Sequence, residues 1–288
     1  MASRLLLVVA AVIAGACAPR LAGESDPRVR SVAVGGARFR ILHQPEDAAA
    51  ADQVAAALGV AVPRIARWGG LRTPVTIAIH PTHERLEAAV RRPGYEWLRA
   101  WARHSKIDLQ SPRTWRLFGA SDADVAEILT HELAHCAMYQ QSGTEYTWPF
   151  KGEPLWFREG LASVTAGQGY RRGTLEDLWR FYAEGGDMDA GEHLPPPGAD
   201  PGGAGGGADP IANPEPLYQR RSDLVYDASH HAFAFLLARY GEARVRGLLR
   251  VMGDGSRFDE AFLAEIGISE AEFAADFRRY VVWQGWRR

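Results

Sequence analysis

Short alternating or β-branched segments occur only in the first 120 residues, whereas helical spacing of apolar residues dominates the rest of the chain. The predicted strands are a hairpin at 31–42 around Gly35-Gly36, a strand at 73–80 and an edge strand at 114–119. The predicted helices cover 46–68, 82–90, 121–141, 155–166, 174–184, 222–240, 242–252, 258–265 and 270–286. Strands that come first and helices that come later predict an α+β fold, with a small N-terminal mixed sheet and a mainly helical C-terminal part.

Two segments fit neither pattern. Residues 91–112 contain scattered aromatic side chains and carry no clear periodicity. Residues 185–216 are rich in Gly and Pro and are expected to form a flexible insertion. This insertion does not read as a phosphate-binding loop, because no Gly-Lys-Ser/Thr follows the glycines and no strand precedes them.

Composition is that of a folded protein. Hydrophobic residues make up 47% of the 288 residues and charged residues 24%, which is enough apolar material for a packed core. The formal net charge is −2, and no basic stripe with interleaved aromatic residues is present. These features argue against a nucleic-acid partner.

The N-terminus has the features of a secretory signal. Arg4 precedes the apolar run 5–13, and small residues lead to Cys17. Residues 1–16 are therefore predicted to be a signal peptide, and the polar segment 17–30 a tether. The run is too short to span a membrane.

Small residues followed by Cys17 resemble a bacterial lipobox, although Ala14 stands where that motif usually has a large aliphatic residue. The resemblance implies that Cys17 is lipidated and anchors the protein to a membrane. Because Ala18 is not Asp, the anchor is expected in the outer membrane, facing the periplasm or the cell surface. The alternative is ordinary cleavage, which would release a soluble periplasmic or secreted protein. In either case Cys136 has no disulfide partner and is expected to be a small buried residue.

The strongest chemical signal is the sequence His131-Glu132-Leu-Ala-His135 in the predicted helix 121–141. A helix turns once in 3.6 residues, so the two imidazoles lie on one face and can bind the same metal ion. Glu132 projects beside them as a candidate general base. Two nitrogen ligands, a base and an open coordination position are typical of zinc metallopeptidases, which implies one Zn²⁺ ion as cofactor.

A catalytic zinc ion usually has a third protein ligand. The metzincin pattern is excluded, because Met138 and Gln141 stand where it requires Gly and His. Glu159, in the predicted helix 155–166, is the preferred candidate, since 24 residues after His135 leave room for a loop and a second helix. Glu145 and Glu153 compete on spacing, but both lie in the loop.

The segment Pro154-Leu-Trp-Phe-Arg-Glu159-Gly-Leu-Ala162, after the His-Glu-x-x-His helix, resembles the gluzincin peptidases, particularly the bacterial peptidase MA-like proteins. The resemblance implies a zincin-like domain over 31–288, with His131, His135 and Glu159 as zinc ligands and Glu132 as the base. Many gluzincins have an Asp one turn after the ligand Glu, which bonds the outer nitrogen of a ligand His. This chain has Ser163 there, a hydroxyl that can make the same contact without the charge. The match is specific over about 121–165 and looser elsewhere.

The resemblance extends to a later helix that faces the cleft. Tyr226 and His230 share one face of it, and either is a candidate donor to the oxyanion formed as water attacks a peptide carbonyl. His231 points elsewhere and is expected to be structural. The family also implies that an edge strand beside the active-site helix pairs with an extended substrate, a role expected here for 114–119.

The remaining candidates have simpler explanations. His43, His80, His83, His104 and His193 are scattered without ligand spacing. The aromatic residues Trp148, Phe150 and Trp156 are candidates for a specificity pocket, with core packing the alternative for Trp156.

The function expected from the sequence is zinc-dependent hydrolysis of peptides or proteins outside the cytoplasm. One alternative is an exported lipoprotein that keeps the fold as a binding or scaffold module without peptidase activity. Another is a zinc hydrolase of non-peptide amides or of the cell wall. The sequence gives no indication of oligomeric state.

Overall fold

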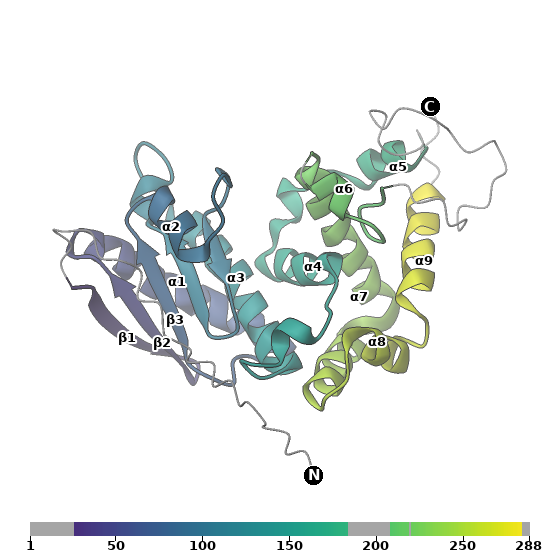
Figure 1. The fold of residues 1–288 in the computed structure, drawn as a ribbon, viewed down its shortest axis with the longest axis horizontal. Helices are drawn as coiled ribbons and strands as arrows, with labels where there is room; N and C mark the ends of the chain where they lie inside the picture. The colour runs from purple at the N-terminus through teal and green to yellow at the C-terminus, as the bar shows by residue number, and fades with distance from the viewer. Residues whose placement is uncertain (1–25, 184–207, 219, 284–288) are drawn as a thin grey trace, which may run out of the picture.

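The computed structural model describes residues 26–183, 208–218 and 220–283 of an α+β protein (Figure 1). The strands β1 (Arg28–Val34), β2 (Ala37–His43), β3 (Val75–His80), β4 (Ala100–Ala102) and β5 (Lys106–Gln110) form one sheet. Its order is β1-β2-β3-β5-β4, with β2, β3 and β5 parallel and the two edge strands antiparallel to their neighbours. The predicted fold class, with a small mixed sheet in the N-terminal part and helices in the C-terminal part, is confirmed.

The predicted hairpin forms through a two-residue turn. Gly35 and Gly36 have φ angles of 55° and 83°, the left-handed conformation that a tight turn between right-twisted strands requires. The first strand begins earlier than expected, since Arg28–Arg30 pair with the end of β2. The tether predicted at 17–30 therefore ends before residue 28. Residues 1–25, with the predicted signal peptide and Cys17, lie outside the described residues.

The predicted edge strand at 114–119 is wrong. Pro112–Thr114 form a short 3₁₀ helix, and Arg116–Gly119 form a turn closed by a 3.0 Å hydrogen bond from the Gly119 amide to the Arg116 carbonyl. The edge strand is instead β4, inside the segment 91–112 that has no clear pattern. Three residues are too few to show an alternation, and pairing with β5 is what makes this segment a strand.

One large core joins the sheet to the helices. Helix α1 (Ala48–Ile65) packs on α3 (Asp122–Ser142), while α2 (His83–Val90) covers β3 and β5. The segment 45–68 is the one candidate membrane span by length and composition among the described residues. Its apolar face packs inside the protein, where Val54, Leu58 and Ile65 are fully buried against the core.

The C-terminal half consists of helices α4 (Leu155–Ala166), α5 (Leu175–Ala183), α6 (Glu215–Tyr218), α7 (Ser222–Gly253), α8 (Phe258–Ile266) and α9 (Glu270–Val282) (Figure 1). Helix α7 contains a break at Gly241, whose φ of 80° is left-handed, as expected from two helices that meet there. Helix α4 packs on both α3 and α7. It therefore links the two halves of the molecule.

The insertion predicted at 185–216 is only partly described. Residues 184–207 lie outside the described part of the chain. In residues 208–216, Asp209 pairs with Asn213 through two backbone hydrogen bonds, and α6 begins at Glu215. Ile211 is buried in the core, which explains why this end of the segment is packed.

Candidate metal centre

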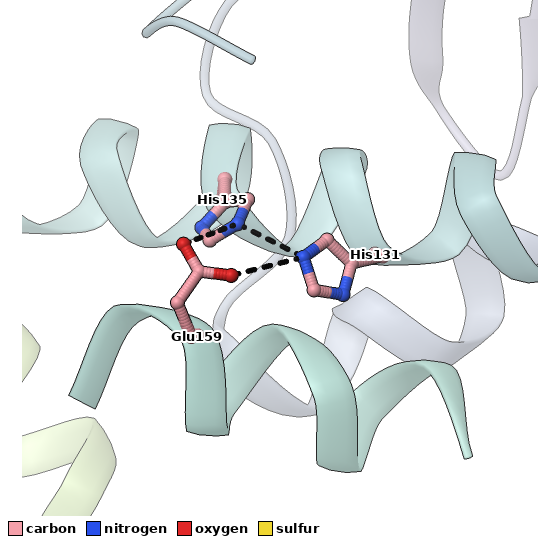
Figure 2. A group of neighbouring side chains, drawn as sticks. All are labelled: His131, His135 and Glu159. Atoms are coloured by element: carbon pink, nitrogen blue, oxygen red, sulfur yellow. Dashed lines mark hydrogen bonds and ion pairs between the residues drawn. The ribbon is translucent and has the colours of Figure 1, made fainter. Parts of the chain in front are cut away.

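Helix α3 begins at the predicted capping box and carries the two histidines. The Ser121 side chain accepts a hydrogen bond from the Asp124 amide, and the Asp124 carboxylate accepts one from the Ser121 amide. Ten residues further on, the Nε2 atoms of His131 and His135 lie 3.2 Å apart on the side of the helix that faces α4 (Figure 2). The i, i+4 spacing therefore brings both rings to one point in space.

Glu159 reaches the same point from α4 (Figure 2). Its Oε2 lies 3.4 Å from His131 Nε2, and its Oε1 lies 3.7 Å from His135 Nε2. The approach of α4 is set by Gly160, where an added Cβ would come within 2.3 Å of the Ser229 carbonyl on α7. A residue without a side chain at this position lets the two helices touch, and this contact fixes how far Glu159 projects toward α3.

The donor set fits a single metal ion. The ligand atoms of His131, His135 and Glu159 all lie within 4.8 Å of one another. Tetrahedral zinc with bonds of about 2.0–2.1 Å requires ligand atoms about 3.3–3.4 Å apart, close to the separations observed here. Two imidazoles and one carboxylate are also the donors of many catalytic zinc sites. Burial alone would raise the pKa of Glu159, but the rings of His135 and His131 hold it well below its usual value, so the carboxylate is charged.

Glu132 lies next to this group and is 9% exposed. Burial raises its pKa, and the positive character of His131 and His135 acts in the opposite direction. A hydrogen bond from the Ala102 backbone also stabilises the charged form. Glu132 is thus a buried carboxylate with an increased affinity for a proton, held between the two histidines and β4.

The Ala102 amide can donate to Glu132 because it lies on the edge of β4 that pairs with no other strand of the described chain. The Arg99 carbonyl accepts a hydrogen bond from the Gln110 amide, and the Arg103 amide donates one to the Lys106 carbonyl. In an antiparallel pair the residues that bond the neighbour alternate. Ala100 and Ala102 therefore direct their backbone groups away from β5, and α3 packs against this strand.

Gln168, which the sequence did not suggest, contacts the outer nitrogen of His131. Its Oε1 lies 3.0 Å from His131 Nδ1, while its Nε2 donates to Glu127 Oε1 at 3.2 Å. Arg172 also donates to Gln168 Oε1, at 3.2 Å. These contacts orient the amide so that its oxygen faces the ring, which requires the hydrogen of neutral His131 to be on Nδ1. The Nε2 lone pair is then directed at the candidate metal position.

Ser163 does not occupy the position expected for a partner of a ligand histidine. Its Oγ lies 2.9 Å from His230 Nδ1 and accepts a 3.3 Å hydrogen bond from Arg172 Nε. The partner of His131 comes from the 3₁₀ helix η5 (Gln168–Arg171), which follows the turn at Gly167. Within the described residues, the Nδ1 atom of His135 is buried without a hydrogen-bond partner.

The two oxyanion candidates differ in their surroundings. Tyr226 is close enough to Glu159 and Glu132 for their charges to act on it, and burial raises its pKa well above the usual value. Its hydroxyl is therefore a hydrogen-bond donor, and it lies 3.2 Å from the Tyr218 hydroxyl. Burial lowers the pKa of His230 to about 4, and its contacts run to Ser163 rather than to the metal group. Of the two candidates, only Tyr226 has the carboxylates of the metal group among the charges that act on its pKa.

The competing third ligands lie elsewhere. Glu145 is exposed in the loop after α3. Glu153 accepts a 2.8 Å hydrogen bond from Ser142. Neither belongs to the group that could hold a metal ion.

The remaining candidates have structural contacts. Trp156 is buried among Phe258, Phe262 and Phe273, as core packing predicts. Trp148 packs on Tyr139 at 4.2 Å, while Phe150 is exposed.

The cysteine and the other histidines are also accounted for. Cys136 is a free, fully buried thiol. His231 lies 2.7 Å from the Gly173 carbonyl, in agreement with a structural role. The partners of the scattered histidines that the structure describes are the Gln44 carbonyl (His43), Asp108 (His80), Gln110 and Glu87 (His83) and the Gly143 carbonyl (His104). His193 lies outside the described residues.

No protein-family model matches the sequence, and a search of curated proteins finds no match. The residues and their geometry are therefore the basis for assigning a function.

Proposed function

We propose that the chain is a zinc-dependent metallopeptidase of the gluzincin type. The observation that carries the proposal is the convergence of His131, His135 and Glu159 on one point, with Glu132 buried beside it. A site that only had to bind a metal ion would not need Glu132. Burial of a carboxylate costs free energy, and a role in proton transfer explains why one is buried here.

His131, His135 and Glu159 would hold the ion, which supplies polarisation of the scissile carbonyl and acidification of a water molecule. Glu132 then takes a proton from that water and passes it to the leaving amine. Its burial supports this role, because a raised pKa makes the carboxylate a better proton acceptor. Tyr226 donates a hydrogen bond to the oxygen that becomes negative during the attack.

The substrate would lie extended along β4. The outward backbone groups of Ala100 and the outward carbonyl of Ala102 can pair with another extended segment, as in other cases of strand addition, while the Ala102 amide stays with Glu132. We therefore propose for β4 the role that the resemblance implied for 114–119. The proposed substrates are peptides or proteins.

The proposed location is outside the cytoplasm, with lipid on Cys17 as the anchor. The support is the sequence of residues 1–17 alone, with its charge, apolar run and small residues before the cysteine. Mass spectrometry of Cys17 in protein isolated from the membrane fraction tests this part of the proposal.

A matched pair of measurements tests the peptidase assignment. Zinc content and hydrolysis of a broad peptide library are measured for the wild type and for Glu132→Gln, which keeps the size of the side chain. We expect one zinc ion in both proteins, and hydrolysis only in the wild type. Zinc bound without hydrolysis by either protein would contradict the proposal and favour a binding or scaffold module. Cleavage of acyl-amino sugars or other non-peptide amides, without cleavage of peptides, would assign a different hydrolase.

A further inference from the structure

Two large apolar side chains are almost fully exposed to solvent at the turn Arg116–Gly119. Leu117 is 90% exposed and Phe118 is 97% exposed, the two highest values among the exposed large apolar residues of the described chain. They occupy the two central positions of a turn closed by the bond from the Gly119 amide to the Arg116 carbonyl. We call Leu117 and Phe118 the apolar tip.

The base of the turn is firmly attached to the domain. The Ala120 amide donates to the Pro112 carbonyl at 2.8 Å, and Trp115 Nε1 donates to the Gln110 carbonyl at 2.9 Å. Trp115 and Ala120 also pack against the main core. The apolar tip is therefore presented on a structured support and not on a loop without contacts.

Two arginines lie at the base of the apolar tip. Arg113 is bound to buried Asp47, and Arg116 is bound to Asp124 at the start of α3. Both arginine side chains are partly exposed, at 47% and 65%. The apolar tip therefore has partly exposed guanidinium groups at its base, which form a polar rim on that side.

The apolar tip lies at the end of the sheet where the described chain begins. The parallel strands β2, β3 and β5 all end at this side, and residues 111–119 directly follow β5. Arg28, the first residue of β1, pairs with His43 at the end of β2. Asp47, four residues later, bonds Ser111 and Arg113 below the tip. The entry of the chain into the sheet and the apolar tip therefore share one end of the molecule.

The covalent distance from Cys17 to this end is short. Eleven residue steps separate Cys17 from Arg28. At no more than about 3.6 Å for each residue, a lipid on Cys17 would keep this end of the sheet within about 40 Å of the bilayer surface. This step rests on the lipid anchor of the proposed function.

We propose that the apolar tip inserts into a lipid bilayer. A stable protein–protein interface needs about 800 Å² from each partner, which two side chains at one turn do not offer. Shallow insertion into a membrane needs only a small apolar wedge with a polar rim that remains at the headgroups. Arginine suits this rim, because its stem can lie along apolar surface while the guanidinium stays in water or near phosphate. Insertion of the tip would be a second contact with the membrane, beside the anchor.

A fluorescent label tests the proposal directly. Phe118→Cys is introduced into the full chain and labelled with an environment-sensitive nitrobenzoxadiazole group. Cys136 is fully buried, and Cys17 is acylated in the lipidated protein, so neither competes for the label. The control is Tyr146→Cys, since Tyr146 is 83% exposed in the loop after α3. Vesicles of phosphatidylcholine with one quarter phosphatidylglycerol are then added.

The expected result is at least a twofold rise in emission for the label at 118, and no rise for the label at 146. Leu117→Cys gives an independent second position for the same measurement, and thermal unfolding checks that each labelled chain is folded. No rise at 117 or 118 would overturn the proposal, as would an equal rise at 146. A response at 118 to an unfolded protein but not to vesicles would assign the tip to protein binding and would also overturn it.

The readout does not depend on catalysis. The same labels in a Glu132→Gln chain should respond equally, so failure of the peptidase assignment leaves the result intact. Mass spectrometry of Cys17 reports separately on the anchor. Membrane insertion by the tip and hydrolysis at the metal centre can therefore fail independently.

Discussion

The Oε1 atom of Gln168 lies 3.0 Å from Nδ1 of His131 and fixes the orientation of this candidate ligand. The amide is itself held, because Nε2 donates to Glu127 and Oε1 also accepts from Arg172. A neutral amide thus takes the place that a carboxylate has in many sites of this kind.

Loss of this contact should weaken zinc binding without removing a ligand. We expect Gln168→Ala to reduce zinc affinity by about 10–100-fold, the range typical for the loss of an outer partner of a ligand histidine. Competition with a chromophoric chelator measures the dissociation constant. Gln53→Ala is the control, because Gln53 bonds Ala120 and Asp122, away from the metal group. Equal affinity in Gln168→Ala and the wild type would show that the contact does not position His131.

The third ligand can be assigned by comparing two glutamates of similar burial on and near α4. Glu159→Gln should weaken zinc binding by more than about 100-fold, since it removes a charged ligand and not an outer partner. Glu153→Gln should leave zinc affinity unchanged, because Glu153 bonds Ser142. Metal content after dialysis, together with chelator competition, separates the two. Retention of zinc by Glu159→Gln and its loss from Glu153→Gln would reverse the assignment.

Loss of the oxyanion donor should lower kcat and leave KM, and so substrate binding, little changed. Tyr226→Phe removes the hydroxyl alone, and we expect kcat to fall by about 100-fold, as for the loss of one such donor, with KM little changed. His230→Gln should lower kcat far less, because the contacts of His230 run to Ser163. Steady-state kinetics on one peptide gives both numbers. A larger loss of kcat in His230→Gln than in Tyr226→Phe would exchange the two roles.

Asp108 should make stability depend on pH at the acidic end. Its side chain is buried, which would raise its pKa, but bonds from His80 and Lys106 together lower the pKa to about 2. The folded pKa is below the unfolded value of about 3.8, so the stabilisation is complete above pH 4 and is lost as pH falls toward 2. The difference corresponds to about 2 kcal/mol.

Chemical denaturation of Asp108→Asn between pH 2 and 7 checks this expectation. The variant should be less stable than the wild type at pH 7, and the difference should shrink as pH falls toward 2. Glu176→Gln is the control, since its partner Arg180 is exposed and a surface pair contributes little. A difference between Asp108→Asn and the wild type that does not change with pH would show that the charge of Asp108 is not what stabilises the fold.

Gly160 and Gly59 should respond to alanine in opposite directions. A Cβ at Gly160 would meet the Ser229 carbonyl at 2.3 Å and the Phe233 Cβ at 2.5 Å, so Gly160→Ala should cost about 2 kcal/mol or more. Gly59 lies inside α1 with nothing within 4 Å of an added Cβ. Gly59→Ala should therefore stabilise the protein by about 0.5–1 kcal/mol, because alanine favours the helix. Urea denaturation of both variants is the measurement, and a Gly160→Ala protein as stable as the wild type would contradict the packing of α4 on α7.

Sequence reasoning was accurate where one strong local signal determines the structure. The bounds predicted for the helix 155–166 are those of α4, and the capping box at Ser121 begins α3 as expected. The His-Glu-x-x-His spacing is enough to predict that His131 lies beside His135, because residues four apart share one face of a helix. The choice of Glu159 over Glu153 rested on the resemblance of the segment 154–162 to the gluzincins and on its place in a predicted helix, since a loop orients a side chain less well.

The errors concern contacts between distant segments. β4 is a strand because β5 lies beside it, and three residues carry no periodicity of their own. The alternation at 114–119 was misleading, because Leu117 and Phe118 are exposed on a turn and do not belong to one buried face. Gln168 was missed because its partner His131 is 37 residues away, and only the turn at Gly167 directs it back toward α3.

The free edge of β4 has a consequence for the kind of molecule that the proposed enzyme would accept. Backbone groups are the same in every residue, so pairing through Ala100 and the Ala102 carbonyl does not depend on the identity of the substrate side chains. In a native domain nearly all such groups are already paired internally. Recognition at this edge would therefore depend on whether a segment of the substrate is folded. The enzyme would cut locally unfolded segments and leave intact domains uncut, whatever their sequences.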